Sequence, residues 1–576
     1  MTNQDPESSR DIETDGELKK RHKRQGKPDD GDYPKKPGRP FPGFRKNFYD
    51  YFAEYSNNTG IHGFKYMGDQ EMTIFERLWW LILFCISLYI CINLIIQTYI
   101  KWDTSPVLVS FARSPTPVWQ VPFPAVTVCS ETKSRQREYN FTENYHKMLN
   151  EIRGENETMT DEEKRKFTDL ALICDNHLFH EGNKTTSFET IKFLMSIAPQ
   201  FDEMLWTCKY TLINGSCENF FTPILTEEGL CYTFNMLDKS ELLKNNVFIP
   251  GGYMSHGRAS EGWNLEDGYP KDAPTNTYPR RAMSAGFSSG FLLLLRAYQQ
   301  DLDYICRGPV QGFKILLHNP AETPRVGMQY FRAPLNQEVV VAVKPDMMTT
   351  SDGLKDYDPR RRQCYFPKER PLAFYQNYTQ QNCEVECLTN YTRAKCGCVA
   401  YHMPHEEGTN ICGSGSIVCM FDAQNELLQR EVQSGISRGD DPAEGEVQSH
   451  CDCLPGCNSL VYNAETSQAD FMWENLFQAY KANMSEFPGV QMTRINIFFK
   501  EQQFITSERN ELYGETDFLA NCGGILGLFT GFSFLSIVEV VYFLTLKLIC
   551  NVKRYGRHYW SGSPQLLNND MYIHKK

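Results

Sequence analysis

Two uncharged stretches near the ends of the chain, Leu78–Ile100 and Phe518–Val538, constrain the fold more than any other feature. Each is long enough for a helix to cross a hydrocarbon core of about 30 Å. The residues between them therefore lie on one side of a membrane. We expect a disordered tail at 1–45, a pre-helix segment at 46–77, a first transmembrane helix at 78–100, an extracellular domain at 101–517, a second transmembrane helix at 518–546 and a C-terminal tail at 547–576.

Basic residues and glycosylation sequons indicate the orientation. Lys and Arg cluster at 19–24, 35–46 and 547–557, so the positive-inside rule places both termini in the cytoplasm. The middle segment carries sequons at Asn140, Asn156, Asn183, Asn214, Asn377, Asn390 and Asn483. A further sequon at Asn57 is expected to stay unused, because it is cytoplasmic. The charged N-terminus does not resemble a signal peptide, so the first span is expected to direct insertion. We predict a multi-pass protein of the plasma membrane.

The chain has 20 cysteines, of which Cys85, Cys91, Cys522 and Cys550 lie in or beside the two spans. The other sixteen are Cys129, Cys174, Cys208, Cys217, Cys231, Cys306, Cys364, Cys383, Cys387, Cys396, Cys398, Cys412, Cys419, Cys451, Cys453 and Cys457. An even number in a glycosylated outer segment predicts up to eight disulfides. The close pairs at 396–398 and 451–453 would also suit zinc, which is the weaker alternative in an oxidising compartment. We interpret the dense cluster from 383 onward as a disulfide-stapled helical subdomain.

Hydrophobic periodicity predicts the elements of the outer segment. Helices are predicted at 141–152, 161–179, 188–205, 380–395 and 467–482. Strands are predicted at 126–129, 313–320, 338–345 and 495–501, the last three in one sheet. Residues 250–281 are rich in Gly, Pro and Asn and are predicted to form a long surface loop. The outer region is thus α+β and large enough to have its own core.

The second uncharged stretch contains the string Gly531-Phe532-Ser533, followed by Glu539. Small residues in such a stretch also serve close helix packing, which explains Gly523, Gly524 and Gly527 equally well. Irregular backbone at membrane depth is tolerated only where it faces protein or water. A carboxylate at that depth usually marks an ion path, and a ring of backbone carbonyls with an acidic ring below it is what a cation filter requires. These residues predict a pore.

Several motifs together resemble one known family. They are His62-Gly63, FPAVTVC (123–129), CYTFN (231–235), the CEVEC…CGC run (383–398), CDCLPGCNSLVY (451–462) and GFSFLSIVE (531–539). From about residue 45 to 550 the chain resembles the degenerin/epithelial sodium channel superfamily. The resemblance implies a membrane α+β fold with two transmembrane helices and a large disulfide-rich extracellular domain. That domain is hand-shaped, with a central β-sheet and a helical finger and thumb. The resemblance also implies a homotrimer or a closely related heterotrimer, sodium selectivity and block by amiloride.

The resemblance also implies roles for individual residues. Gly531, Phe532 and Ser533 correspond to the selectivity filter, although family members often have a smaller residue than Phe in the middle. Glu539 is expected to concentrate cations. Asp517 falls where the family usually has a small residue, so it would place three carboxylates at the outer mouth of a trimeric pore; alternatively it is a helix N-cap. His62 and Gly63 match the family's gating motif, and the alternative for His62 is a core or interfacial histidine.

At subfamily level the chain is most similar to the FMRFamide-activated sodium channels of invertebrates. That likeness implies a short, amidated, cationic neuropeptide as ligand, which needs apolar pockets and a carboxylate. The candidate residues are Tyr145, Met148, Leu149, Asp169, Asp175, Phe188, Glu189 and Ile191. Taken singly, each of them is as well explained by ordinary helix core or a solvated face. A proton-gated channel of the same superfamily is the alternative function.

Two rival classes fit less well. An ATP-gated two-span channel would cluster lysines for the triphosphate and lacks the motifs above. A two-span ecto-enzyme would need a phosphate loop or a nucleophile elbow outside the membrane, and we expect neither. We therefore predict no enzyme, no cofactor, no metal site and no nucleic-acid partner. The partners are sodium ions, membrane lipid, the peptide and amiloride as a blocker. The net charge of −12 fits attraction of cations and basic ligands.

Overall fold

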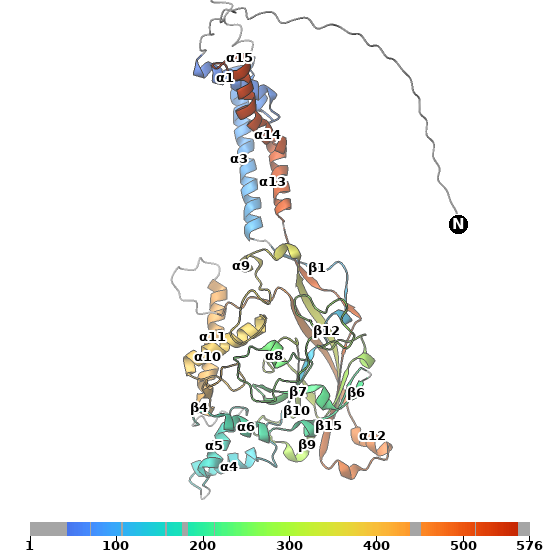
Figure 1. Ribbon diagram of the computed structural model, residues 1–576. Coiled ribbons are helices and arrows are strands. Elements are labelled where there is room, and N and C mark those ends of the chain that lie inside the picture. Colours follow the sequence, from blue (N-terminus) through green and yellow to red (C-terminus); the bar gives the residue numbers. More distant parts are fainter. Residues whose placement is uncertain are drawn as a thin grey trace, which may run out of the picture. The chain divides into compact units, whose positions relative to one another are not determined.

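The computed structural model describes residues 43–69, 71–104, 107–155, 158–174, 182–211, 213–437, 451–512 and 514–562 (Figure 1). The chain divides into two compact units. The first, here called the membrane unit, comprises Met1–Ile95 and Cys522–Lys576, and the second, the outer unit, comprises Ile96–Asn521. Two predicted site residues, Asn156 and Asp175, lie outside the described residues, as do residues 1–42 and 563–576.

The membrane unit is helical. Its helices, two of which continue into the outer unit, are α1 (Phe44–Asn58), α2 (Phe64–Gly68), α3 (Ile74–Thr104), α13 (Glu515–Thr530), α14 (Phe534–Tyr542), the π-helical turn η8 (Phe543–Lys547) and α15 (Leu548–Tyr555). Among the described residues, two helices are long and apolar enough to cross a membrane, Ile74–Thr104 and Phe534–Tyr555. The segment predicted at 518–546 as the second transmembrane helix is interrupted between Thr530 and Phe534, at the string Gly531-Phe532-Ser533 where the sequence indicates irregular backbone.

The outer unit contains an eight-stranded sheet in which β1, β17, β12, β15, β9, β5 and β6 are neighbours in that order, and β14 pairs with β12. The strands are β1 (Val107–Phe111), β5 (Leu205–Tyr210), β6 (Ile213–Gly215), β9 (Phe291–Tyr298), β12 (Gln337–Thr350), β14 (Ser459–Asp470), β15 (Val490–Phe499) and β17 (Ser507–Glu511). β12 runs parallel to β15, with Val339 opposite Ile495, and antiparallel to β14.

A second sheet has five strands in the order β11-β10-β3-β8-β7. They are β3 (Ala125–Ser130), β7 (Phe221–Thr226), β8 (Gly229–Phe234), β10 (Gly312–His318) and β11 (Phe331–Pro334). The prediction that 313–320 shares a sheet with 338–345 and 495–501 is therefore wrong. All seven residues of β10 are buried, so its sequence shows a strand but not the sheet to which it belongs. Two short pairs complete the sheets: β2 (Thr116–Pro117) with β16 (Gln503–Phe504), and β4 (Thr185–Thr186) with β13 (Ile411–Cys412).

The helices of the outer unit are α4 (Phe141–Ile152), α5 (Asp161–Leu170), α6 (Phe188–Ile197), α7 (Phe201–Met204), α8 (Lys239–Leu242), α9 (Pro359–Arg362), α10 (Gln380–Cys396), α11 (Ile417–Ser437) and α12 (Trp473–Ala479). The helix predicted over 188–205 is interrupted at Pro199, which cannot donate a helical hydrogen bond. Only the end of the prediction for 467–482 is helical, because 459–470 forms β14. Helix α5 ends at Leu170, earlier than predicted.

An aromatic core joins the two sheets. The rings of Phe234 on β8 and Phe291 on β9 stack with centroids 4.1 Å apart, and Phe123, Tyr210 and Phe221 surround them. The loop at 250–281 contains no regular helix or strand, but Trp263 and Tyr278 within it are buried. The prediction of a surface loop is thus wrong for these aromatic residues.

All sixteen outer cysteines are paired, which leaves none for the zinc alternative. The pairs are Cys129–Cys231, Cys174–Cys306, Cys208–Cys217, Cys364–Cys457, Cys383–Cys453, Cys387–Cys451, Cys396–Cys419 and Cys398–Cys412. Three of these disulfides start on α10, and one of the three joins it to α11, which lies beside it (Figure 1). The stapled helical subdomain predicted from the cysteine density is this pair of helices.

Candidate functional site

The break in the second span follows the ordinary rules for stopping and starting a helix. Gly531 has φ +68° and donates its N–H to the carbonyl of Gly527 at 2.9 Å, which is the left-handed cap that ends many helices. Ser533 is extended and forms a reciprocal capping arrangement with Ser536 at the start of α14. The string Gly-x-Ser therefore ends one helix and begins another, with Phe532 as the single residue between the two caps.

The pre-helix segment packs against this break. The N–H of His62 donates to the carbonyl of Thr530 at 2.9 Å, and a Cβ added at Gly531 would lie 2.8 Å from the His62 ring. Gly63 has φ +83° and begins α2. The structure thus brings together the two motifs that the sequence analysis treated separately. A side chain at 531 is opposed both by the backbone conformation and by the histidine.

Two further contacts reach the same region. The hydroxyl of Ser87, on α3, donates to the carbonyl of Phe529 at 2.7 Å. The N–H of Gly60 lies 3.4 Å from Oε2 of Glu539, the half-buried carboxylate on α14. Sequence reasoning missed Ser87, because a lone serine in an apolar helix carries no spacing signal.

The segments predicted to face the cytoplasm, before α3 and after α14, also pack against each other within the membrane unit. Glu54 on α1 forms an ion pair with Lys547 at 3.1 Å and accepts a hydrogen bond from the Ser561 hydroxyl. Asn47 on α1 is fully buried and donates to the carbonyl of His558 at 2.6 Å. The segment before α3 and the segment after α14 therefore form one small assembly, for which the aromatic and amphipathic sequence at 47–77 was the only signal.

In the outer unit, Asp517 lies in the first turn of α13 and is exposed. Its Oδ2 accepts a hydrogen bond from the N–H of Gly514 at 3.3 Å. Asp517 is not the N-cap of the alternative reading, because α13 begins two residues earlier; its carboxylate instead reaches back from the first turn and stabilises the helix start, while its exposure leaves it available to solvent cations.

An aromatic group lies at the base of the outer unit, where α3 and α13 enter it. Trp102 stacks on Phe518 with centroids 5.2 Å apart, and Tyr99 contacts the same ring. Arg361 of α9 lies over the Trp102 ring, with its guanidinium 4.1 Å from the ring centroid. Sequence analysis did not single out Arg361, whose only signal was its place in the run Arg360-Arg361-Arg362.

The predicted peptide-binding residues do not converge on one pocket among the described residues. Asp169 is buried and accepts a hydrogen bond from the Thr190 hydroxyl, and burial raises the pKa of its carboxyl. Glu189 is exposed and pairs with Lys192. Tyr145, Met148 and Phe188 pack on the core between α4, α5 and α6, and Leu149 is half-buried. Ile191 is buried and lines an apolar cavity with Phe248, Tyr253, Tyr375 and Tyr401.

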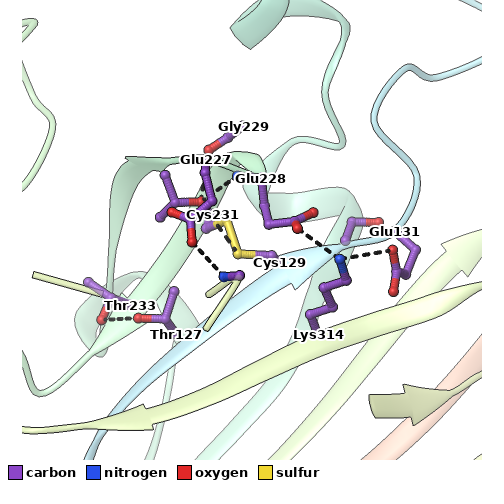
Figure 2. The surroundings of a disulfide bond; sticks show 12 residues. Thr127, Cys129, Glu131, Glu227, Glu228, Gly229, Cys231, Thr233 and Lys314 are labelled. Atoms are coloured by element: carbon purple, nitrogen blue, oxygen red, sulfur yellow. Dashed lines mark hydrogen bonds and ion pairs between the residues drawn. A yellow bond between two sulfur atoms is a disulfide. The ribbon is translucent and has the colours of Figure 1, made fainter. Parts of the chain in front are cut away.

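A buried charge cluster, defined as Glu131, Lys133, Glu228, Arg307 and Lys314, lies beside the disulfide Cys129–Cys231. Figure 2 shows the Lys314 ammonium between the carboxylates of Glu228 and Glu131. Lys133 approaches Glu228 at 2.7 Å and Arg307 approaches it at 2.8 Å. Burial alone would raise the pKa of Glu228, but Lys133 and the other two cations outweigh it and lower the value to about 2. Glu228 is therefore ionised at every physiological pH.

A second carboxyl, that of the half-buried Glu322, behaves differently. Glu322 follows β10, and its N–H donates to the carbonyl of Asn319. Burial raises the pKa of Glu322 to about 7, assisted by the charge of Glu384 and opposed by a hydrogen bond to Thr379, the N-cap of α10. The group sits where the loop after β10 meets α10, since Asn382 also donates to the carbonyl of Ala321 at 3.0 Å. It is the kind of carboxyl that changes charge near neutral pH.

The predicted sequons differ in accessibility. Asn183, Asn390 and Asn483 are exposed, whereas Asn140 and Asn377 are half-buried. Asn140 caps α4 by accepting from the N–H of Glu143 at 3.0 Å. Asn214 lies in β6.

The sequence does contain two strings of the nucleophile-elbow pattern G-x-S-x-G in the outer unit, at 286–290 and 435–439, contrary to expectation. The first includes a short turn, Phe287–Ser289, that leads into β9, whereas a nucleophile elbow leads from a strand into a helix. The second begins in the last turn of α11 and extends beyond the described residues. Gly290 is required for packing, because a Cβ there would lie 2.3 Å from the carbonyl oxygen of Ile497. A search of the described residues finds no cluster of His, Cys, Asp and Glu suited to a metal ion.

Comparison with known proteins assigns the family. The family described as amiloride-sensitive sodium channel matches residues 55–543. The chain is 28% identical over 513 residues to pickpocket protein 28 of Drosophila melanogaster, covering 86% of this chain and 78% of that protein. It is 23% identical over 533 residues to the sodium channel protein Nach of the same species, covering 89% and 90% of the two chains. With acid-sensing ion channel 1 of Gallus gallus it shares 23% over 516 residues, covering 84% and 82%. The chain belongs to the amiloride-sensitive sodium channel family, the degenerin/epithelial sodium channel superfamily, which consists of ion channels and not of enzymes.

Proposed function

We propose that this chain forms a ligand-gated, sodium-selective cation channel of the plasma membrane, assembled as a homotrimer and blocked by amiloride. Both termini lie in the cytoplasm. The observation that carries the proposal is the capped break at Gly531–Ser533, which opens the backbone of the second span at membrane depth. Irregular backbone there requires a protein or water environment, and an aqueous axis between three copies supplies one.

The residues of the break act as the filter. Carbonyl groups near Gly531, Phe532 and Ser533 replace part of the hydration shell of a sodium ion. The Phe532 side chain does not prevent this, because coordination uses the main chain. Glu539 supplies negative charge below the filter, and exposed Asp517 attracts cations at the outer mouth. His62 and Gly63 gate the path through their contact with the break.

Opening begins in the outer unit. Ligand binding changes the packing of its helical region on the sheets, and the α10–α11 pair, stiffened by disulfides, transmits the change to Trp102 and Phe518 through α9. A ligand shifts the gate only by its difference in affinity for the open and shut states, and a nearly complete shift takes about 5 kcal/mol. Three sites need under about 2 kcal/mol each, which one aromatic contact and one charged hydrogen bond provide.

The ligand that we propose is a short, amidated, cationic peptide of the FMRFamide type. The aromatic residues around the cavity at Ile191 are the surface that supports this choice, and Glu189, on the same helix as Ile191, is the candidate carboxylate that is exposed. Gating by protons is the second candidate. Glu322 favours it, because a half-buried carboxyl with a pKa of about 7 changes charge when the extracellular pH falls.

Recordings from oocytes that express the full chain test the proposal. FMRFamide, then acid, then amiloride are applied at negative voltage. Inward sodium current with the peptide and not with acid supports peptide gating, and current with acid alone supports proton gating. Replacement of Ser533 or Glu539 is expected to alter selectivity or conductance. Unchanged permeation in both variants, or failure of cysteine-reactive reagents to reach 531–539 in any activated condition, contradicts the pore assignment.

A further inference from the structure

The last carbonyl groups of α13 need hydrogen-bond donors from outside the helix. The final turn of a helix leaves four carbonyls without partners in the same helix, and inside a membrane no lipid group replaces them. In this chain the caps come from three different segments. Gly531 donates to the Gly527 carbonyl, His62 donates to the Thr530 carbonyl, and the Ser87 hydroxyl donates to the Phe529 carbonyl.

The Ser87 contact differs from the other two because it comes from the first span. Ser87 is half-buried on α3, and its Oγ lies 2.7 Å from the Phe529 oxygen, a good hydrogen-bond distance. Phe529 is two residues before Gly531, so its peptide plane belongs to the last turn that sets the direction of the chain into the break. The neighbouring Thr530 hydroxyl is already used within its own helix, where it donates to Leu526 at 2.7 Å.

We propose that Ser87 is a positioning residue for ion selection. Its hydroxyl holds the Phe529 carbonyl against α3, so that the carbonyls of the break keep one orientation toward the ion. Without the hydroxyl, the Phe529 oxygen loses its donor, and the last turn of α13 gains freedom to rotate. The carbonyls after it then vary in direction, and discrimination between sodium and potassium falls. Ser87 acts through the backbone of α13 and does not touch the ion itself.

The inference rests on the proposed channel function, and its test separates the two. Sodium-to-potassium permeability ratios are measured from reversal potentials in oocytes that express Ser87→Ala, Ser87→Thr or the wild-type chain. Ser87→Ala is expected to lower the ratio by about threefold, the size of one interhelical hydrogen bond in a membrane. Ser87→Thr keeps the hydroxyl and is expected to restore the ratio. Thr545→Val is the matched control, because that hydroxyl donates to Val541 of its own helical segment at 2.6 Å.

The outcomes are distinguishable. If the wild-type chain conducts and Ser87→Ala leaves the sodium-to-potassium permeability ratio unchanged, the inference about Ser87 is wrong while the proposed channel function stands. This holds even if the variant is less stable. A ratio lowered equally by Thr545→Val also overturns it, since any lost hydroxyl would then suffice. Absence of current from the wild-type chain contradicts the proposed function as well. If Ser87→Ala fails to reach the surface, Ser87→Cys provides a weaker donor and is expected to give an intermediate ratio.

Discussion

The guanidinium of Arg361 lies 4.1 Å from the centre of the Trp102 ring and donates to the Trp102 carbonyl at 3.1 Å. Arg361 is held in place by its neighbour, since the buried Arg362 pairs with Glu369 and donates to the carbonyl of Cys364. Two adjacent arginines at the end of α9 thus connect the disulfide-bonded Cys364 with the last turn of α3.

Replacement of Arg361 tests this connection. Arg361→Gln removes the cation from the Trp102 ring, which is worth about 0.5–2 kcal/mol. If the contact carries the opening movement, the stimulus needed for half-maximal current is expected to rise by about 2- to 30-fold, with the ion selectivity unchanged. Concentration–response curves measure the effect. The control is Arg360→Gln, which removes an exposed arginine one residue away. Equal curves for wild type and Arg361→Gln would show that the contact does not carry the movement.

Gly531 is expected to tolerate no side chain. Gly531→Ala requires a left-handed backbone that costs about 1 kcal/mol for alanine and places a Cβ against the His62 ring. We expect loss of current or of surface expression, measured by recording and surface labelling. Gly527→Ala is the control, because the nearest atom to its Cβ would be the Phe532 oxygen at 4.0 Å. In the Gly531→Ala background, His62→Ala is expected to recover part of the loss. No recovery would mean that backbone strain, and not the histidine, excludes the side chain.

Glu322 predicts a specific dependence on pH. Its pKa in the folded chain is raised to about 7 from a usual value near 4.5. The conformation that buries Glu322 therefore binds more protons than one that exposes it, and its stability increases as pH falls from about 8 to about 5. Thermal unfolding of the purified chain is expected to show this rise in wild type. The rise is expected to be smaller in Glu322→Gln, which is neutral at all pH values. Parallel pH profiles for the two chains would contradict the assignment.

The charge cluster around Glu228 is expected to be structurally essential. Glu228→Gln leaves the buried Lys133 and Lys314 and the half-buried Arg307 with one carboxylate fewer, and breaking a buried pair costs about 3–5 kcal/mol. Surface expression and unfolding temperature are expected to fall together. Glu189→Gln is the control, since the exposed pair of Glu189 with Lys192 contributes little. If both variants behave alike, the cluster does not brace the turn between β7 and β8.

Local signals predicted much of the fold. Helix α4 has the bounds that its periodicity predicts: Asn140 caps its start, and Phe141 on its apolar face stacks on Phe167. The break at 531–533 was visible for the same reason, since glycine and serine are the residues that end and begin helices. The density of cysteines predicted a stapled helical subdomain, but the sequence left the disulfide pairing open, and of its two helices only α10 was predicted.

Contacts between segments that are far apart in the chain could not be predicted from the sequence. β10 was placed in the wrong sheet because a strand buried on both faces has the same pattern in either one. The end of β14 was mistaken for a helix, because nine of its twelve residues are exposed and the last eight show no alternation in burial. The contacts of His62 with Thr530 and of Ser87 with Phe529 join segments at opposite ends of the chain. No spacing rule connects such residues.

The capping bond of Gly531 to Gly527 closes the first piece of the second span, and the Ser533–Ser536 arrangement opens the second, so bending at Phe532 keeps the helical hydrogen bonds of both pieces. The joint is also the stretch whose oxygens are proposed to meet the ion. A change in the bend angle there changes the direction of those carbonyl oxygens. Conductance and selectivity among cations therefore cannot vary independently. Partly open channels should therefore show a different order of permeability among alkali cations from fully open ones. That order would report the bend angle between the two pieces of the second span.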